Sequence, residues 1–204
     1  MYFIRTYCYT QHPVRGTIPI ALTPQQEEML YTIDNFHKSV ISMDRQTGKT
    51  TCTSAYMLWY AMFHPYNVIL TGSCTLGMSK DSLRRIYFMH DALPDFLKTP
   101  LKVRNKTTMR FDNGSQIIAQ AAGPDFSRGF CANLINLDEF AYIPAAKTQQ
   151  IMSNLFIGTK IIISSTNKNL SDFDSILQQA SSCHTLHGDI TETGTNGFKA
   201  YCGS

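Results

Sequence analysis

The apolar residues of the chain gather into short continuous runs separated by longer stretches of helical character. Four of these runs are Lys38–Met43, Asn67–Thr71, Ala132–Leu137 and Lys160–Thr166. Strands that read as nearly uninterrupted apolar runs are typical of a parallel sheet whose two faces are covered by helices. The pattern therefore predicts an α/β fold with a mostly parallel sheet and helices on both faces.

Helices are predicted in the stretches between the runs. The first has Thr23 as its N-cap and Pro24 at its first helical position, and it extends through Asn35. The other predicted helices span 51–63, 76–93, 144–155 and 170–180. Three short alternating segments, 101–106, 108–112 and 115–121, predict extra strands, and Asp112-Asn-Gly-Ser115 is a strong hairpin turn.

The two ends of the chain carry less pattern than the middle. Residues 1–21 predict an irregular or strand-bearing lead-in, residues 22–182 the core, and residues 183–204 a poorly patterned tail. One interpretation of the tail is the start of a linking subdomain. The N-terminus has no long apolar core of a secretory signal, and no run reaches the roughly 20 residues that span a bilayer. We therefore expect a cytoplasmic protein without a membrane segment.

Composition adds few constraints. A length of 204 residues is sufficient for one domain with a buried core, and a net charge of +3 permits a nucleic-acid partner without requiring one. The six cysteines are scattered without a Cys-x-x-Cys pair, so free thiols are expected. Cys183, His184 and His187 look faintly like a metal cluster, but a packed or solvent-facing group is the simpler interpretation.

The stretch Asp44-Arg-Gln-Thr-Gly-Lys-Thr50 lies between an apolar run and a predicted helix, which is the arrangement of a phosphate-binding loop. Unpaired N–H groups at the start of a helix, together with the helix dipole, favour a bound phosphate. Gly48 allows close approach of the backbone, Lys49 can reach the β and γ oxygens, and Thr50 can hold Mg²⁺. The residues expected to bind nucleotide here are Arg45, Gln46, Thr47, Gly48, Lys49, Thr50 and Thr51.

Two acidic residues, Asp138 and Glu139, follow directly on the apolar run Leu134–Leu137. A carboxylate at the end of a buried strand can hold Mg²⁺ opposite Thr50, and the next carboxylate is placed to polarise an attacking water. The alternative is that the pair only caps the following helix. Because ligands of parallel sheets bind at the carboxyl ends of strands, the phosphate loop, the two acids and Ser164–Thr166 are expected to converge.

Three segments taken together resemble a known family, the large terminase subunit of myovirus-type tailed bacteriophages. They are Asp-Arg-Gln-Thr-Gly-Lys-Thr-Thr51, Leu-Ile-Asn-Leu-Asp-Glu-Phe-Ala141 and Ile-Ile-Ile-Ser-Ser-Thr166, and the resemblance covers roughly residues 22–180. It implies a RecA-like P-loop NTPase core. It also implies an ATPase that uses ATP and Mg²⁺ to drive double-stranded DNA into viral proheads.

The resemblance implies roles for individual residues. Gln26 matches the glutamine with which the family reads adenine, and an amide can both donate to and accept from the adenine edge. Arg45 matches the loop arginine that stabilises γ-phosphate charge, so the implied catalytic residues are Arg45, Lys49 and Glu139. Arg128 is a candidate arginine finger for a neighbouring subunit, although a solvated loop arginine is the simpler interpretation. The coupling motif that senses the γ-phosphate matches Ser164, Ser165 and Thr166.

The family also implies partners. These are double-stranded DNA, the phage portal, the small terminase subunit and further copies of the chain in a homo-oligomeric ring. The implied location is the cytoplasm of the infected bacterial host, and transiently the prohead portal. Full-length members carry a nuclease domain, and because few residues follow Thr166 we expect that domain to be absent here.

Two other hypotheses remain open from the sequence. A helicase-like or DNA-repair translocase shares the RecA-like core, but such enzymes usually need two motor cores. A nucleotide-binding remnant with little turnover is compatible with Met43, which stands where phosphate loops usually begin with glycine. ATP binding without hydrolysis would favour the remnant.

Overall fold

A nine-stranded sheet forms the centre of the computed structural model, which describes residues 1–153, 158–166, 171–184 and 199–203. Its strands are β3 (Lys38–Met43), β4 (Val68–Ser73), β5 (Leu101–Arg104), β6 (Thr108–Phe111), β7 (Gln116–Ala121), β8 (Leu134–Leu137), β9 (Lys160–Ser165), β10 (Ser181–His184) and β11 (Lys199–Gly203). Their order is β10-β11-β3-β9-β8-β4-β7-β6-β5. Every pair from β10 to β7 is parallel, and β7, β6 and β5 are joined antiparallel. The predicted mostly parallel sheet is confirmed.

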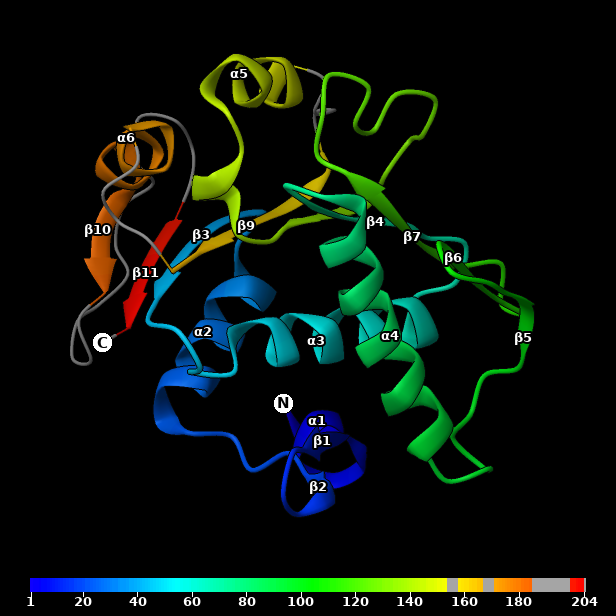
Figure 1. The fold of residues 1–204 in the computed structure, drawn as a ribbon. Coiled ribbons are helices and arrows are strands. Elements are labelled where there is room, and N and C mark those ends of the chain that lie inside the picture. The colour runs from blue at the N-terminus through cyan, green and yellow to red at the C-terminus, as the bar shows by residue number, and fades with distance from the viewer. Residues whose placement is uncertain (154–157, 167–170, 185–198, 204) are drawn as a thin grey trace.

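Helices cover both faces of this sheet (Figure 1). They are α1 (Tyr2–Tyr7), α2 (Pro24–Asn35), α3 (Lys49–Phe63), α4 (Leu76–Ala92), α5 (Ala145–Ser153) and α6 (Ser171–Gln179), with a short 3-10 helix η1 (Phe140–Tyr142). Figure 1 shows α2, α3 and α4 on one face and α5 and α6 on the other. The phosphate loop leads into α3, and α3 begins two residues earlier than the sequence predicts.

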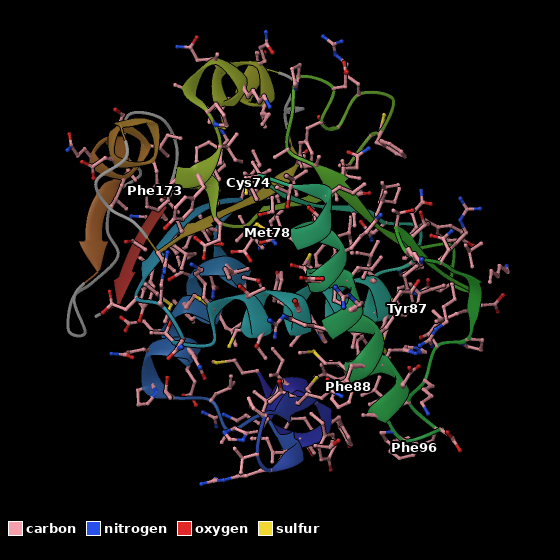
Figure 2. The ribbon with its side chains drawn as sticks, viewed as in Figure 1. Cys74, Met78, Tyr87, Phe88, Phe96 and Phe173 are labelled. Carbon is pink, nitrogen blue, oxygen red and sulfur yellow. The ribbon has the colours of Figure 1, made fainter. Side chains whose placement is uncertain are left out.

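Alternation along the central strands divides the apolar residues into two cores. Ile162 of β9 belongs to the core under α2, α3 and α4, whereas its neighbours Ile161 and Ile163 belong to the core under α5 and α6. Successive side chains of a strand point to opposite faces, so a strand buried on both sides must be apolar throughout. Tyr87 of α4 and Phe173 of α6, labelled in Figure 2, belong to the two different cores.

The start of α2 is fixed by a capping box. The hydroxyl of Thr23 accepts from the backbone N–H of Gln26 at 3.3 Å, and the Gln26 side chain accepts from the backbone N–H of Thr23 at 3.0 Å. Two of the unpaired donors at the helix start are satisfied in this way. The predicted N-cap is confirmed, and it gives Gln26 a structural role besides any role in binding.

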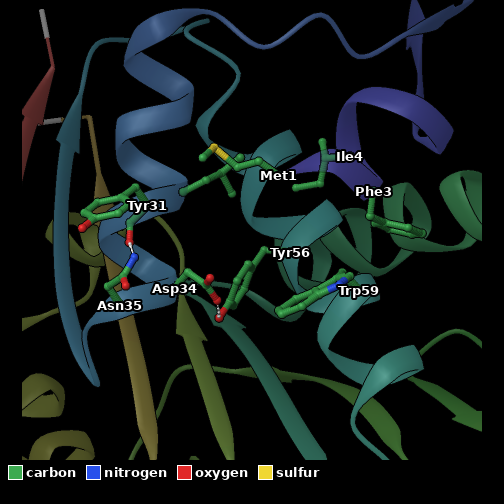
Figure 3. Close-up of a pocket in the computed structure, with 9 residues that line it drawn as sticks. Met1, Phe3, Ile4, Tyr31, Asp34, Asn35, Tyr56 and Trp59 are labelled. Atoms are coloured by element: carbon green, nitrogen blue, oxygen red, sulfur yellow. Dashed lines mark hydrogen bonds between the residues drawn. The ribbon is translucent and has the colours of Figure 1, made fainter.

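The N-terminal lead-in is more ordered than the sequence predicts. It forms α1 and then a hairpin of β1 (Tyr9–His12) and β2 (Gly16–Pro19). Phe3 and Ile4 of α1 are buried against α2 and α3, where a cavity of about 90 Å³ remains, lined partly by Tyr56 and Trp59 (Figure 3). A six-residue helix is too short to show a period in the sequence, so only these contacts reveal it.

The C-terminal end also contributes to the core, where the sequence showed little pattern. β11 pairs with β3 in parallel, and Tyr201 on it is 1% exposed and belongs to the core beneath α2. Of the suggested cluster of Cys183, His184 and His187, the last residue lies outside the described residues. In the part of the chain that is described, no three His, Cys, Asp or Glu residues gather as metal ligands.

The structure also describes the state of four cysteines and the length and polarity of the helices. Cys8, Cys52, Cys74 and Cys131 are free, as predicted, and burial raises the pKa of Cys8 and of Cys52 to about 12. Within the described ranges, every helix is too short or too polar to cross a membrane.

Candidate nucleotide-binding and catalytic site

Three neighbouring strands bring the predicted site together. β9 lies between β3 and β8, with Ser42 of β3 opposite Ser165 of β9 and Leu137 of β8 opposite Ile163. The strands are parallel, so the segments after Met43, Leu137 and Ser165 all begin at the same edge of the sheet. The predicted convergence of the phosphate loop, the two acids and the coupling motif follows from this strand order.

The phosphate loop is a tight turn that ends on Gly48. The Thr47 hydroxyl donates to the carbonyl of Asp44 at 2.8 Å, and Gln46 has a positive φ of 64°. Gly48 has a φ of 80° and directly precedes α3. A Cβ at Gly48 would also lie 2.5 Å from Nε2 of Gln26, so glycine is favoured by both the backbone and the space.

Lys49 and Thr50 start α3 and point to the two acids. The Lys49 side chain is 3% exposed, and its Nζ lies 3.5 Å from Oε1 of Glu139. Thr50 Oγ1 donates to Oδ2 of Asp138 at 2.8 Å. A buried ammonium with one carboxylate at this distance is a costly arrangement for stability alone. It suits a site where an anion will join the lysine.

Asp138 is buried and accepts three hydrogen bonds. Its Oδ1 accepts from the Ser164 hydroxyl at 2.9 Å and from the backbone N–H of Glu139 at 3.0 Å, while Oδ2 accepts from Thr50. The three donors come from three different segments at the sheet edge. This carboxylate therefore fixes the phosphate loop, β9 and the turn after β8 relative to one another.

Glu139 is held in an unusual backbone conformation. Its φ is 53°, in the left-handed region that non-glycine residues rarely adopt, which costs on the order of 1–3 kcal/mol. Its Oε2 accepts from the hydroxyl and the backbone N–H of Thr166 at 3.1 and 3.4 Å. No side-chain bond from Glu139 caps η1, and the two carboxylates instead contact Thr50 and Lys49, so these contacts favour a binding role over a helix cap.

Arg45 meets a partner that the sequence did not indicate. Its Nη2 donates to the phenol oxygen of Tyr142 at 2.9 Å. This hydrogen bond, with a smaller contribution from the Glu139 carboxylate, raises the pKa of Arg45. Tyr142 lies only three residues after Glu139, and that proximity is the one signal in the sequence that could have suggested it.

Gln26 lies against the phosphate loop. Its Nε2 donates to the carbonyl of Thr47 at 2.6 Å, and its Oε1 is the acceptor of the capping box. One N–H of the amide remains for another acceptor. Gln46 and Thr51 belong to the loop and to the first turn of α3, and Ser165 is fully buried at the end of β9.

Arg128 is separate from these residues. It is 65% exposed and pairs with Asp125 at 2.7 Å, in the loop that follows β7. The loop is anchored by Phe126, which is 1% exposed and packs beside Gly72. A Cβ on Gly72 would lie 2.5 Å from the Phe126 ring. The structure therefore presents Arg128 on a fixed loop without bringing it to the site of the same chain.

The oxygen ligands at the site fit Mg²⁺. The Thr50 hydroxyl and the Asp138 carboxylate lie 2.8 Å apart at the start of α3, beside the loop that would hold phosphates. Mg²⁺ prefers oxygen ligands and is commonly held by one or two protein groups together with phosphates and water. The site needs no larger cluster of carboxylates for this metal.

Comparison with known proteins agrees with the geometry. A family model described as the N-terminal part of the terminase large subunit, T4-like-virus type, matches residues 40–181. The large terminase ATPase domain of Thermus phage P74-26 has a TM-score of 0.68 at 17% identity, over 89% of this chain and 80% of that one. The large terminase of bacteriophage HK97 has a TM-score of 0.69 at 17% identity, over 85% of this chain and 38% of that one.

A third similar structure contains a nucleotide. The large terminase of a thermophilic bacteriophage, in complex with ADP, has a TM-score of 0.61 at 12% identity, over 89% of this chain and 45% of that one. The chain thus spans less than half the length of this terminase and of the HK97 terminase. These likenesses give the RecA-like fold, and the family model gives the family. The chain belongs to the family of N-terminal domains of T4-like-virus-type terminase large subunits.

Proposed function

We propose that this domain hydrolyses Mg-ATP and couples the reaction to movement of double-stranded DNA into proheads. One observation carries the proposal: Thr50 and Lys49 of the phosphate loop contact Asp138 and Glu139 directly, at 2.8 and 3.5 Å. A phosphate cradle and a pair of carboxylates in contact are what phosphoryl transfer to water requires. Membership of the terminase family makes a helicase or DNA-repair translocase the weaker hypothesis.

The proposed chemistry assigns one task to each residue. Lys49 and Arg45 neutralise charge on the transferred phosphoryl group, and Glu139 orients the attacking water and accepts its proton. The new P–O bond forms as the bond to the leaving ADP oxygen breaks. Thr50 and Asp138 would hold Mg²⁺, which when bound neutralises charge on the phosphate oxygens. Gln46, Thr47, Gly48 and Thr51 complete the cradle.

Coupling to DNA would begin at the end of β9. Ser164 donates to Asp138 and Thr166 donates to Glu139, so a change at either carboxylate reaches this strand through one hydrogen bond. Ser165 lies between them, fully buried. We infer that these three residues sense loss of the γ-phosphate.

The wider assembly is part of the same proposal. The large terminase of the thermophilic bacteriophage has also been solved in complex with ATP-γ-S, which supports nucleotide binding by this fold. We infer that Gln26 contacts adenine through its remaining N–H and that Arg128 acts on a neighbouring subunit in a homo-oligomeric ring. The portal, the small terminase subunit and DNA would be the partners, in the cytoplasm of the infected host.

The test is Mg-dependent ATP hydrolysis by the purified chain, with and without double-stranded DNA, beside the variant Glu139→Gln. We expect turnover to fall by about 10²–10⁴-fold while ATP binding is kept, because the amide cannot accept the proton of water. Asp95→Asn, an exposed carboxylate far from the site in sequence, should match the parent chain. Normal turnover in Glu139→Gln would overturn the assignment. ATP binding without turnover in the parent chain would favour the remnant.

A further inference from the structure

The hydrogen bond between Arg45 and Tyr142 joins two parts of the site that are 97 positions apart in the sequence. Arg45 belongs to the phosphate loop, and Tyr142 is the last residue of η1, the turn that follows Glu139. The bond is 2.9 Å long and involves one of the five N–H groups of the guanidinium. The remaining N–H groups can serve another acceptor at the same time.

Tyr142 extends from a rigid turn. Phe140 is fully buried, Ile143 is 4% exposed, and the backbone N–H of Tyr142 donates to the carbonyl of Glu139 at 3.0 Å. The phenol is itself 41% exposed. The backbone from which the phenol projects is therefore fixed relative to Glu139, while the side chain remains accessible from solvent.

Arg45 has no such anchor of its own. It is an exposed residue in a loop whose next residue, Gln46, has a φ of 64°. A long exposed side chain loses rotamer entropy when it is ordered, and an arginine left free would visit many orientations. The bond to Tyr142 reduces this cost before a ligand arrives.

The chemistry of the partner is also informative. A phenol is a neutral acceptor, so it orients the guanidinium without neutralising it, whereas a carboxylate at the same place would form a stronger charge-assisted pair. The full positive charge stays available for an anion. The effect of Glu139 on the pKa of Arg45 is consistent with a guanidinium held near the catalytic carboxylate.

We propose that Tyr142 is a positioning residue that holds the Arg45 guanidinium beside Glu139, with its other N–H groups ready for the γ-phosphate. The proposal rests on the proposed function, because it takes the γ-phosphate of ATP as the anion that Arg45 meets. No covalent bond is made or broken in this step. Tyr142 acts on the reaction only through Arg45.

The first test is kinetic and uses Tyr142→Phe, which removes the hydroxyl and keeps the ring. We expect kcat for ATP to fall by about 3–10-fold, the range for one hydrogen bond, with KM changed by less than about 2-fold. ADP affinity should be unchanged, because ADP lacks the γ-phosphate. Tyr66→Phe, at an 82% exposed tyrosine, is the matched control and should have no effect. In an Arg45→Ala background, adding Tyr142→Phe should not lower kcat further.

The second test needs no turnover. NMR of the arginine side chains measures rotation of the Arg45 guanidinium in the chain without nucleotide, and Tyr142→Phe should make that rotation faster. Unchanged rotation would overturn the proposal, and so would faster rotation with parental kcat. A loss of kcat that persists in the Arg45→Ala background would also overturn it. If the parent chain binds ATP without hydrolysis, the proposed function fails, while the rotation measurement still decides whether Tyr142 holds Arg45.

Discussion

The two ends of α3 are built for different purposes. At its start, Lys49 is 3% exposed and Thr50 bonds to Asp138, so the helix begins among buried polar groups. At its end, the 48% exposed ring of Phe63 packs edge-on against the buried ring of Phe3 in α1, with ring centroids 5.5 Å apart, and Phe3 lines the cavity in Figure 3. Buried charges rarely stabilise a fold, whereas buried rings do. The start of the helix is therefore organised for ligand binding and its end for stability.

The largest effect expected from this comparison is on ATP binding. Lys49→Met should weaken ATP affinity by about 100-fold, because a charge-assisted contact to phosphate is lost. The free energy of unfolding should change by less than about 1 kcal/mol, since Glu139 keeps its bonds from Thr166 and is 19% exposed. Calorimetric titration and urea unfolding measure the two quantities. Lys147→Met, at an exposed lysine of α5, is the control. Parental ATP affinity in Lys49→Met would show that the phosphate loop is misassigned.

The opposite pattern is expected at the other end of the helix. Phe3→Ala should lower the free energy of unfolding by about 3 kcal/mol, because the ring packs on Phe63 and is 7% exposed. ATP affinity should stay unchanged. Phe96→Ala removes a ring of the same size that is 80% exposed, and it should cost less than about 0.5 kcal/mol. A fall in ATP affinity in Phe3→Ala would mean that the two ends of α3 are not independent.

Prediction from sequence succeeded where the signal was local. The bounds of β3 were predicted correctly because an apolar run marks a strand buried on both faces, and β9 was predicted to within one residue. The N-cap Thr23 was predicted because capping chemistry is written in adjacent residues. α1 and β11 were missed: α1 is defined by contacts with α3 and β2, and β11 by pairing with β3, and neither leaves a period in its own short sequence.

For the site, too, the sequence predicts some features and misses others. Lys49, Thr50, Asp138 and Glu139 could be predicted to converge, because the carboxyl ends of parallel strands share one edge. The contact of Arg45 with Tyr142 depends on the path of a turn, which no residue pattern specifies. The positive φ of Glu139 is likewise a product of the surrounding hydrogen bonds.

A smaller effect is expected from Ser164, whose hydroxyl bonds to the buried Asp138. Ser164→Ala should lower the free energy of unfolding by about 1 kcal/mol and slow hydrolysis severalfold, because Asp138 loses one of its three donors. Ser42→Ala on the adjacent strand is the control. Among the described residues the Ser42 hydroxyl has no hydrogen-bond partner, so its removal should leave both quantities nearly unchanged. Equal effects of the two substitutions would show that packing, not the hydrogen bond, is what Ser164 supplies.

The smallest effect is expected where charges are exposed. At the antiparallel end of the sheet, Arg104 donates twice to Asp91, at 2.6 Å each, and this pairing lowers the pKa of Asp91. A carboxylate whose pKa is lower in the folded chain stabilises the fold above its unfolded pKa, and that contribution is lost as the pH falls through the folded pKa. Both side chains are about half exposed, so the contribution should be below about 1 kcal/mol.

Urea unfolding of Arg104→Met beside the parent chain measures this contribution. The two free energies of unfolding should differ by about 0.5 kcal/mol at neutral pH and converge at a pH below the folded pKa of Asp91, where the carboxyl is protonated in both states. Lys102→Met, which breaks an ion pair with Asp112 of similar exposure that has one contact to the carboxylate instead of two, should show a smaller difference. A difference that persists at low pH would come from the stacking of Arg104 on the Tyr87 ring, 4.6 Å away, and not from the ion pair. The exposed pair would then stabilise the fold by packing on a ring, as Phe3 of α1 does on Phe63.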